Sequence, residues 1–75
     1  MNTDQLVSAL RAFQHRTPFR PFLIEFVAGE PLRVTHPEAI EQYDQLFHWR
    51  GPDRRDCVFS AQHVVRLIDP PPVAS

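Results

Sequence analysis

The fold is decided by two alternating runs, Phe22-Leu23-Ile24-Glu25-Phe26-Val27 and Leu32-Arg33-Val34-Thr35, in a chain of 75 residues. In the first run an apolar side chain occupies every second position, which is the period of a strand with one buried face. Between the runs stands Ala28-Gly29-Glu30-Pro31, which carries turn residues. The pattern therefore predicts an antiparallel hairpin with strands over 22–27 and 32–35.

Downstream of this hairpin the chain predicts one helical turn and three more short strands. Thr35 and Glu38 have capping-box spacing with a proline between them, which favours a single helical turn carrying Ala39 and Ile40. The strands are expected over 45–50, 57–60 and 64–69, with a turn at Gly51-Pro52-Asp53-Arg54. In the first of them, Phe47 and Trp49 lie on one face and Leu46 and His48 on the other.

Upstream of the hairpin the sequence predicts one helix, over about 3–15, with Leu6, Leu10 and Phe13 on one apolar face. Asn2 or Thr3 can cap it, and Gln5 is in capping-box position after Asn2. The connector 17–22 contains two prolines, which exclude helix, and two phenylalanines, which should hold it against the body of the protein.

Together these elements predict an α+β fold that is mainly β. The N-terminal helix is followed by a five-stranded, strongly bent antiparallel sheet that closes as a small SH3-like or Sm-like barrel, with the helix over one opening. A ferredoxin-like fold would need a second long helix, and no later segment has a helical period. We expect a single small domain over 1–69 and a proline-rich tail over 70–75.

The composition argues for a cytoplasmic protein with partners other than membranes. Cys57 is the only cysteine, which fits a reducing compartment, and no run approaches the length of a membrane span. The formal net charge is −1, so no overall basic field attracts nucleic acid and little repulsion opposes self-association. A core this small often needs a partner subunit, so we expect a homo-oligomer.

The reactive side chains form no recognisable catalytic or metal motif. Four soft metal ligands of the strand region are not at zinc-site spacing; they are His36, His48, Cys57 and His63. Two glycines are too few for a phosphate-binding loop, and the acids of 38–44 are expected in a solvated loop. We therefore expect no cofactor, no metal and no catalytic residues. A small-ligand or catalytic site around His36 and Glu38 is the alternative, if they share a pocket.

One concentration of aromatic and basic residues surrounds Trp49. Arginines beside an aromatic ring are a common way to hold single-stranded nucleic acid, although Asp53 and Asp56 reduce the positive charge here. An aromatic residue on an edge strand is also a favoured interface anchor, and Trp49 could equally belong to the core. The candidate interaction surface comprises Trp49, Phe47, Arg50, Arg54, Arg55, His36 and Glu38.

Two family resemblances follow from these motifs. The chain resembles a family of uncharacterised short bacterial proteins in which a Pro-Phe-x-Pro-Phe segment leads into a strand, a Gly turn and a Val-x-His-Pro-Glu stretch. The matching residues are Pro18 to Phe22, Gly29 and Val34 to Glu38. The family's turn usually reads Asp-Gly-Arg, where this chain has Ala28-Gly29-Glu30. This resemblance implies no particular activity.

The second resemblance is to bacterial Sm-like RNA chaperones, through the leading helix, the five short strands and the segment 58–65. In those proteins an aromatic-Lys-His run lines the RNA pocket. Here the corresponding residues are Phe59-Ser60-Ala61, so only the aromatic carries over. The absence of the Lys and His contacts argues more against RNA binding than against ring assembly through edge strands.

From the sequence, the protein is expected to be a non-enzymatic interaction module that self-associates through an edge strand. A different protein is a second expected partner. An Sm-like RNA-binding protein that uses Trp49 and the neighbouring arginines is the alternative, and its binding would weaken steeply with salt.

Overall fold

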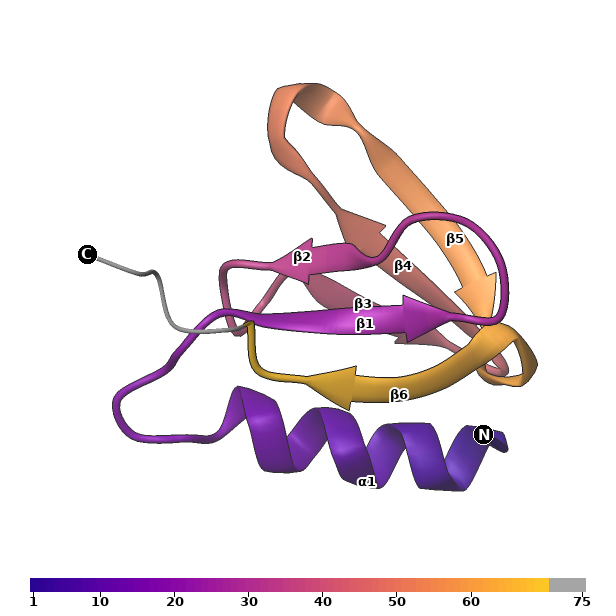
Figure 1. Ribbon diagram of the computed structural model, residues 1–75, viewed down its shortest axis with the longest axis horizontal. Helices are drawn as coiled ribbons and strands as arrows, with labels where there is room; N and C mark the ends of the chain where they lie inside the picture. Colours follow the sequence, from indigo (N-terminus) through magenta and orange to yellow (C-terminus); the bar gives the residue numbers. More distant parts are fainter. Residues whose placement is uncertain (71–75) are drawn as a thin grey trace.

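The computed structural model describes residues 1–70, which form one N-terminal helix followed by two three-stranded antiparallel sheets (Figure 1). The strand order is β2-β1-β6 in the first sheet and β3-β4-β5 in the second. The elements are α1 (Thr3–Gln14), β1 (Phe22–Phe26), β2 (Leu32–Val34), β3 (Ile40–Tyr43), β4 (Leu46–Arg50), η1 (Pro52–Arg54), β5 (Asp56–Ser60), η2 (Ala61–His63) and β6 (Val64–Ile68). The predicted α+β class with mainly strand is confirmed.

Helix α1 begins as its sequence predicts. The Asn2 side chain accepts a hydrogen bond from the backbone N–H of Gln5, at 2.8 Å, and the Gln5 side chain accepts one from the backbone N–H of Asn2. This reciprocal pair satisfies two donors that the first helical turn leaves free. Leu6 and Leu10 are buried, so the predicted apolar face is the one that packs against the sheets.

The connector after α1 is held in place by Arg16, a role that the sequence pattern did not indicate. Its guanidinium lies 4.7 Å from the centre of the Phe13 ring and forms a 2.7 Å ion pair with Asp69, beyond the last strand. The same group donates a 2.9 Å hydrogen bond to the carbonyl oxygen of Arg20. Arg16 therefore ties the end of α1 to the connector and to the end of β6.

The first sheet contains the predicted hairpin. Strand β1 is its middle strand and pairs antiparallel with β2 and with β6, which returns from the other end of the chain. Phe22 and Ile24 are fully buried on the face that the alternation predicted. Figure 1 shows β6 between β1 and α1.

In the second sheet the structure corrects the prediction for 35–40. The backbone N–H of Ala39 donates to the carbonyl oxygen of His36, which closes a tight turn, and no helical turn follows. Ile40 instead begins β3, which pairs antiparallel with β4. Residues 1–70 consequently form six strands, where the sequence predicted five.

The core lies between the inner faces of the two sheets. The Phe47 and Phe59 rings of the second sheet stack with centres 5.8 Å apart, and Phe26 of the first sheet meets Phe59 edge-on at 5.1 Å. Leu10 of α1 lines a small gap with Ile40 and Phe47, so the helix faces the second sheet across this gap and contacts β6 and η2 directly. None of the helices formed by residues 1–70 has both the length and the apolar content needed to span a bilayer.

Candidate functional site

Two of the predicted interaction residues point into the protein. Strand β4 is the middle strand of its sheet, and its side chains alternate between the core and the outer face. Phe47 is 1% exposed and Trp49 is 9% exposed, so both belong to the core. The interpretation of Trp49 as an aromatic on an edge strand is therefore wrong, because β4 has a neighbour on each side.

The Trp49 ring is fixed by contacts on both sides. Its indole N–H donates a 3.1 Å hydrogen bond to the carbonyl oxygen of Arg33 in β2, which links the two sheets. Gly51 lies against the six-membered part of the ring, where a Cβ atom would overlap it. An indole held in this way has little free face on which a nucleic-acid base could stack.

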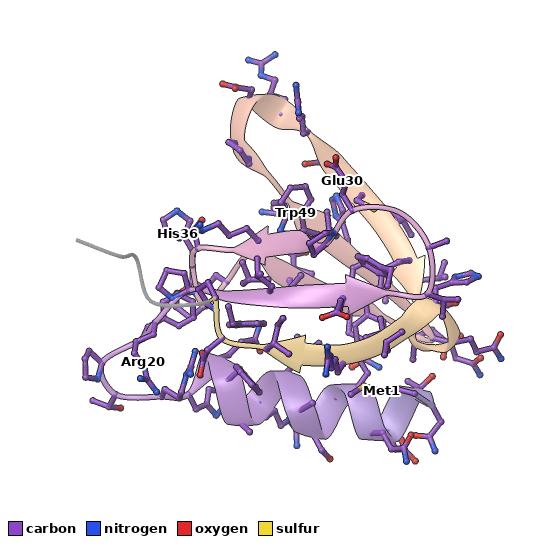
Figure 2. All side chains as sticks on the ribbon, viewed as in Figure 1. Met1, Arg20, Glu30, His36 and Trp49 are labelled. Carbon is purple, nitrogen blue, oxygen red and sulfur yellow. The ribbon has the colours of Figure 1, made fainter. Side chains whose placement is uncertain are left out.

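Trp49 is one of the residues that line a cleft of about 520 Å³ between the two sheets. One wall is the segment from Glu30 to His36, which includes β2, and the other is the end of β4 with the turn that leads to β5. Figure 2 shows Glu30, His36 and Trp49 around this region. The cleft brings together two segments that are well separated along the chain.

The cleft contains some of the predicted surface and omits the rest. Arg50, Arg55 and His36 line it together with Arg33, which the sequence did not single out. Arg54 and Glu38 are exposed and are not among the lining residues. His36 lines this cleft and Glu38 does not, so this cleft does not bring the two together.

The outer face of the second sheet carries an exposed apolar patch, made of Tyr43, Leu46 and Val58, that we call the outer patch. Their exposed fractions are 56%, 50% and 61%. Tyr43 is opposite Leu46 in the β3–β4 pairing, and His48, two residues after Leu46, is opposite Val58 in the β4–β5 pairing. All three side chains therefore emerge on the same face. No prediction from the sequence included them.

Charged side chains border the outer patch in opposite-sign pairs. Arg50 forms a 2.5 Å ion pair with Glu41, whose carboxylate also accepts a hydrogen bond from the Tyr43 hydroxyl. His48 lies 3.3 Å from Asp56 on the other side. The border of the outer patch therefore carries both signs of charge through Arg50 and Glu41.

Glu41 changes the pKa of Tyr43, which can be measured. The hydrogen bond to the Glu41 carboxylate, followed by the negative charge of that group, raises the pKa of Tyr43 above its ordinary value of 10.0, against a smaller opposite effect of Arg50. The fold thus favours the neutral phenol. Any stability from this contact is complete below the ordinary pKa of tyrosine and is lost as the pH rises through the raised one.

We expect the phenolate absorbance of this protein to appear with a midpoint above 10.0. Tyr43 is the only tyrosine, so the titration reports this group alone. Glu41→Gln should lower the midpoint, because it removes the negative charge beside the phenol. A wild-type midpoint at or below that of free tyrosine would show that the contact is not formed in solution.

Among residues 1–70, no three side chains of His, Cys, Asp or Glu gather in a way that could hold a metal ion. Comparison with known proteins adds no relatives, since no family model, no curated protein and no solved structure matches the chain. The two family resemblances stay predictions, and the function is argued from the two surfaces alone.

Proposed function

We propose that the protein is an interaction module that forms a symmetric dimer through β5 and the outer patch. The observation that carries this proposal is the combination of an edge strand with exposed apolar residues. Strand β5 pairs only with β4 in the described part of the chain, and Val58 at its centre is 61% exposed. An unprotected edge of this kind is a template for another strand.

The sequence of β5 suits pairing with a second copy of itself. In an antiparallel pair centred on Val58, each Val58 lies opposite the Val58 of the second copy, and Asp56 lies opposite Ser60. No like charges face each other, which would destabilise the pair. Twofold assemblies of this type are the commonest in soluble oligomers. The two three-stranded sheets would join into one continuous sheet, with the outer patches side by side.

The bulk charge and the borders of the outer patch also favour self-association. The formal net charge of −1 produces little repulsion between copies. The ion pair of Arg50 with Glu41 places both signs of charge at the edge of the patch, and the Asp56 carboxylate there has the His48 ring 3.3 Å away, so the patch has no border of a single sign of charge. A strongly acidic or strongly basic partner would find no surface of opposite net charge on the outer patch.

We also propose that the two sheets are the halves of one bent barrel of the SH3-like or Sm-like type. Strands β2 and β3 follow each other in the chain with five residues between them. If they count as one interrupted strand, the order becomes β6-β1-β2/β3-β4-β5, with β5 and β6 as the two edges. The hydrogen bonds from Trp49 to Arg33 and from the backbone of Arg50 to Ala39 support continuity across the interruption.

Cysteine trapping tests the dimer directly. We expect Val58→Cys, in a Cys57→Ser background that leaves one thiol, to form a covalent dimer under mild oxidation. Cα atoms directly opposite each other in an antiparallel pair are about 4.5 to 5.5 Å apart, which is within the range for a disulfide. Non-reducing gel electrophoresis of the native protein gives the dimer fraction.

The matched control is Val27→Cys in the same background, because Val27 is even more exposed, at 71%, and lies in the turn after β1. We expect it to remain largely monomeric. Equal cross-linking of the two variants would show that the disulfide forms by random collision, and it would refute pairing through β5.

RNA binding is not the function that the surfaces support best. Trp49 was the expected stacking residue, and its ring is buried and tethered to Arg33. A titration with labelled uridine-rich RNA at low salt distinguishes the two functions, since phosphate-dominated binding must fall steeply as salt is added.

A further inference from the structure

The cleft above Trp49 has the features of a small-molecule site that is independent of the proposed dimer. Its volume of about 520 Å³ lies within the range in which proteins bind small ligands. The lining divides into an apolar part, formed by Pro31, Leu32, Trp49 and Pro52, and a basic part.

The apolar part is built before any ligand arrives. The hydrogen bond from the Trp49 indole to Arg33 and the close approach of Gly51 fix the ring in one position. The wall opposite belongs to β2, which is paired with β1. Binding between these walls therefore requires little ordering of the protein side chains, which favours affinity.

The basic part has more positive charge than its surroundings neutralise. Arg33, Arg50 and Arg55 line the cleft, and Glu30 is the one carboxylate among the lining residues. Arg50 already pairs with Glu41. Within residues 1–70, Arg33 and Arg55 have no carboxylate within 4.0 Å, so their guanidinium groups have unused hydrogen-bond donors. Such groups bind a carboxylate in a two-point geometry.

We propose that this cleft binds a small aromatic carboxylate, with its apolar body against Pro31, Leu32 and Pro52, beside the largely buried Trp49 ring, and its carboxylate towards Arg55 and Arg33. Both halves of the lining are needed for this choice. An inorganic anion would leave the apolar half unused, and a neutral aromatic would leave the arginines unused. His36 lies in the same lining and can add a further donor.

The test uses the indole N–H of Trp49 as a reporter, because the chain has one tryptophan and this group gives one signal in a proton–nitrogen NMR spectrum. Benzoate, benzyl alcohol and inorganic phosphate are titrated into the full chain. We expect benzoate to shift the indole signal saturably and to bind about tenfold more tightly than benzyl alcohol, which has the ring without the charge. Phosphate should bind more weakly than benzoate.

Two arginine variants locate the carboxylate. We expect Arg55→Gln to weaken benzoate binding about tenfold, because it removes a charged hydrogen-bond donor. The Arg55 side chain is exposed, so its replacement should leave the fold intact. Arg54→Gln is the matched control, since Arg54 is the adjacent arginine and does not line the cleft. Arg33→Gln gives a second variant on the opposite wall and should also weaken binding.

Three results would overturn the proposal. Benzoate that does not shift the indole signal excludes the site. Equal affinities for benzoate and benzyl alcohol, or for benzoate and phosphate, show that the two halves of the cleft do not act together. If Arg54→Gln weakens benzoate binding as much as Arg55→Gln does, the binding depends on general surface charge and not on a defined site. None of these results depends on whether β5 forms a dimer.

Discussion

Replacing Phe22 by alanine is expected to unfold most of the protein. Phe22 is fully buried, and its ring joins three parts of the molecule, because it contacts Phe13 of α1 at 5.0 Å and Phe19 of the connector at 6.3 Å between ring centres. Removing a buried phenylalanine side chain costs about 3 to 5 kcal/mol. A core of this size supplies roughly the same amount, so little net stability would remain.

Urea unfolding followed by circular dichroism measures this loss. Phe22→Leu keeps most of the apolar volume and should retain a measurable transition at lower urea, so the effect can be quantified even if the alanine variant is unfolded. Val27→Ala, at a 71% exposed position, should stay within about 0.5 kcal/mol of the original protein. A Phe22→Ala protein that unfolds within about 1 kcal/mol of the original would contradict this description of the core.

The second large effect is expected for Gly51→Ala. A Cβ atom at this position would overlap the Trp49 ring and lie 2.5 Å from the carbonyl oxygen of Arg55. The same oxygen accepts a 2.8 Å hydrogen bond from the backbone N–H of Gly51, which closes the turn between β4 and β5. The added methyl group must therefore displace either the Trp49 ring or the turn. Overpacking of this kind costs about 1 to 3 kcal/mol.

Trp49 emission distinguishes this mechanism from a general loss of stability. We expect the Gly51→Ala variant to show red-shifted emission while still folded, because the ring is displaced towards solvent. Gly29→Ala is the matched control. Gly29 has φ of 90° and no atom within 4 Å of an added Cβ, so alanine there costs about 1 to 2 kcal/mol of backbone strain without disturbing Trp49. Unchanged emission in Gly51→Ala would refute the close packing of ring and glycine.

Most of the fold could be predicted from local patterns. The period of two in 22–27, the capping box at Asn2 and the glycine and proline turns each depend on neighbours in sequence, and each is present in the structure. The predicted strands 45–50, 57–60 and 64–69 differ from β4, β5 and β6 by one residue at an end. Such differences are usual where hydrogen bonding at the ends of elements is incomplete.

Strand β3 could not be recognised because its two faces do not differ in polarity. Ile40 and the exposed Gln42 are on the same face as Trp49 and Phe47, while Glu41 and Tyr43 are on the other face, so each face has one apolar and one polar residue. The spacing of Thr35 and Glu38 favoured a helical start locally. The pairing of β3 with β4, which is a tertiary interaction, overrides that preference.

The candidate surfaces were harder to predict than the fold. Alternation in β4 separates Phe47 and Trp49 from Leu46 and His48, but it does not indicate which pair is buried. The packing of one face of this sheet against the first sheet decides this, and it places the aromatics inside. The cleft joins residues 30–36 to 49–55, and only the arrangement of the two sheets brings those segments together.

The most direct test of the proposed assembly is the solution mass of the full chain by light scattering after gel filtration, over a range of concentrations. We expect a mass that approaches twice the 8.7 kDa of one chain as the concentration rises. Val58→Lys, which places a charge at the centre of the free edge, should keep the mass at that of one chain, and Val27→Lys should not. A wild-type protein that stays at 8.7 kDa at high micromolar concentration would contradict self-association through β5.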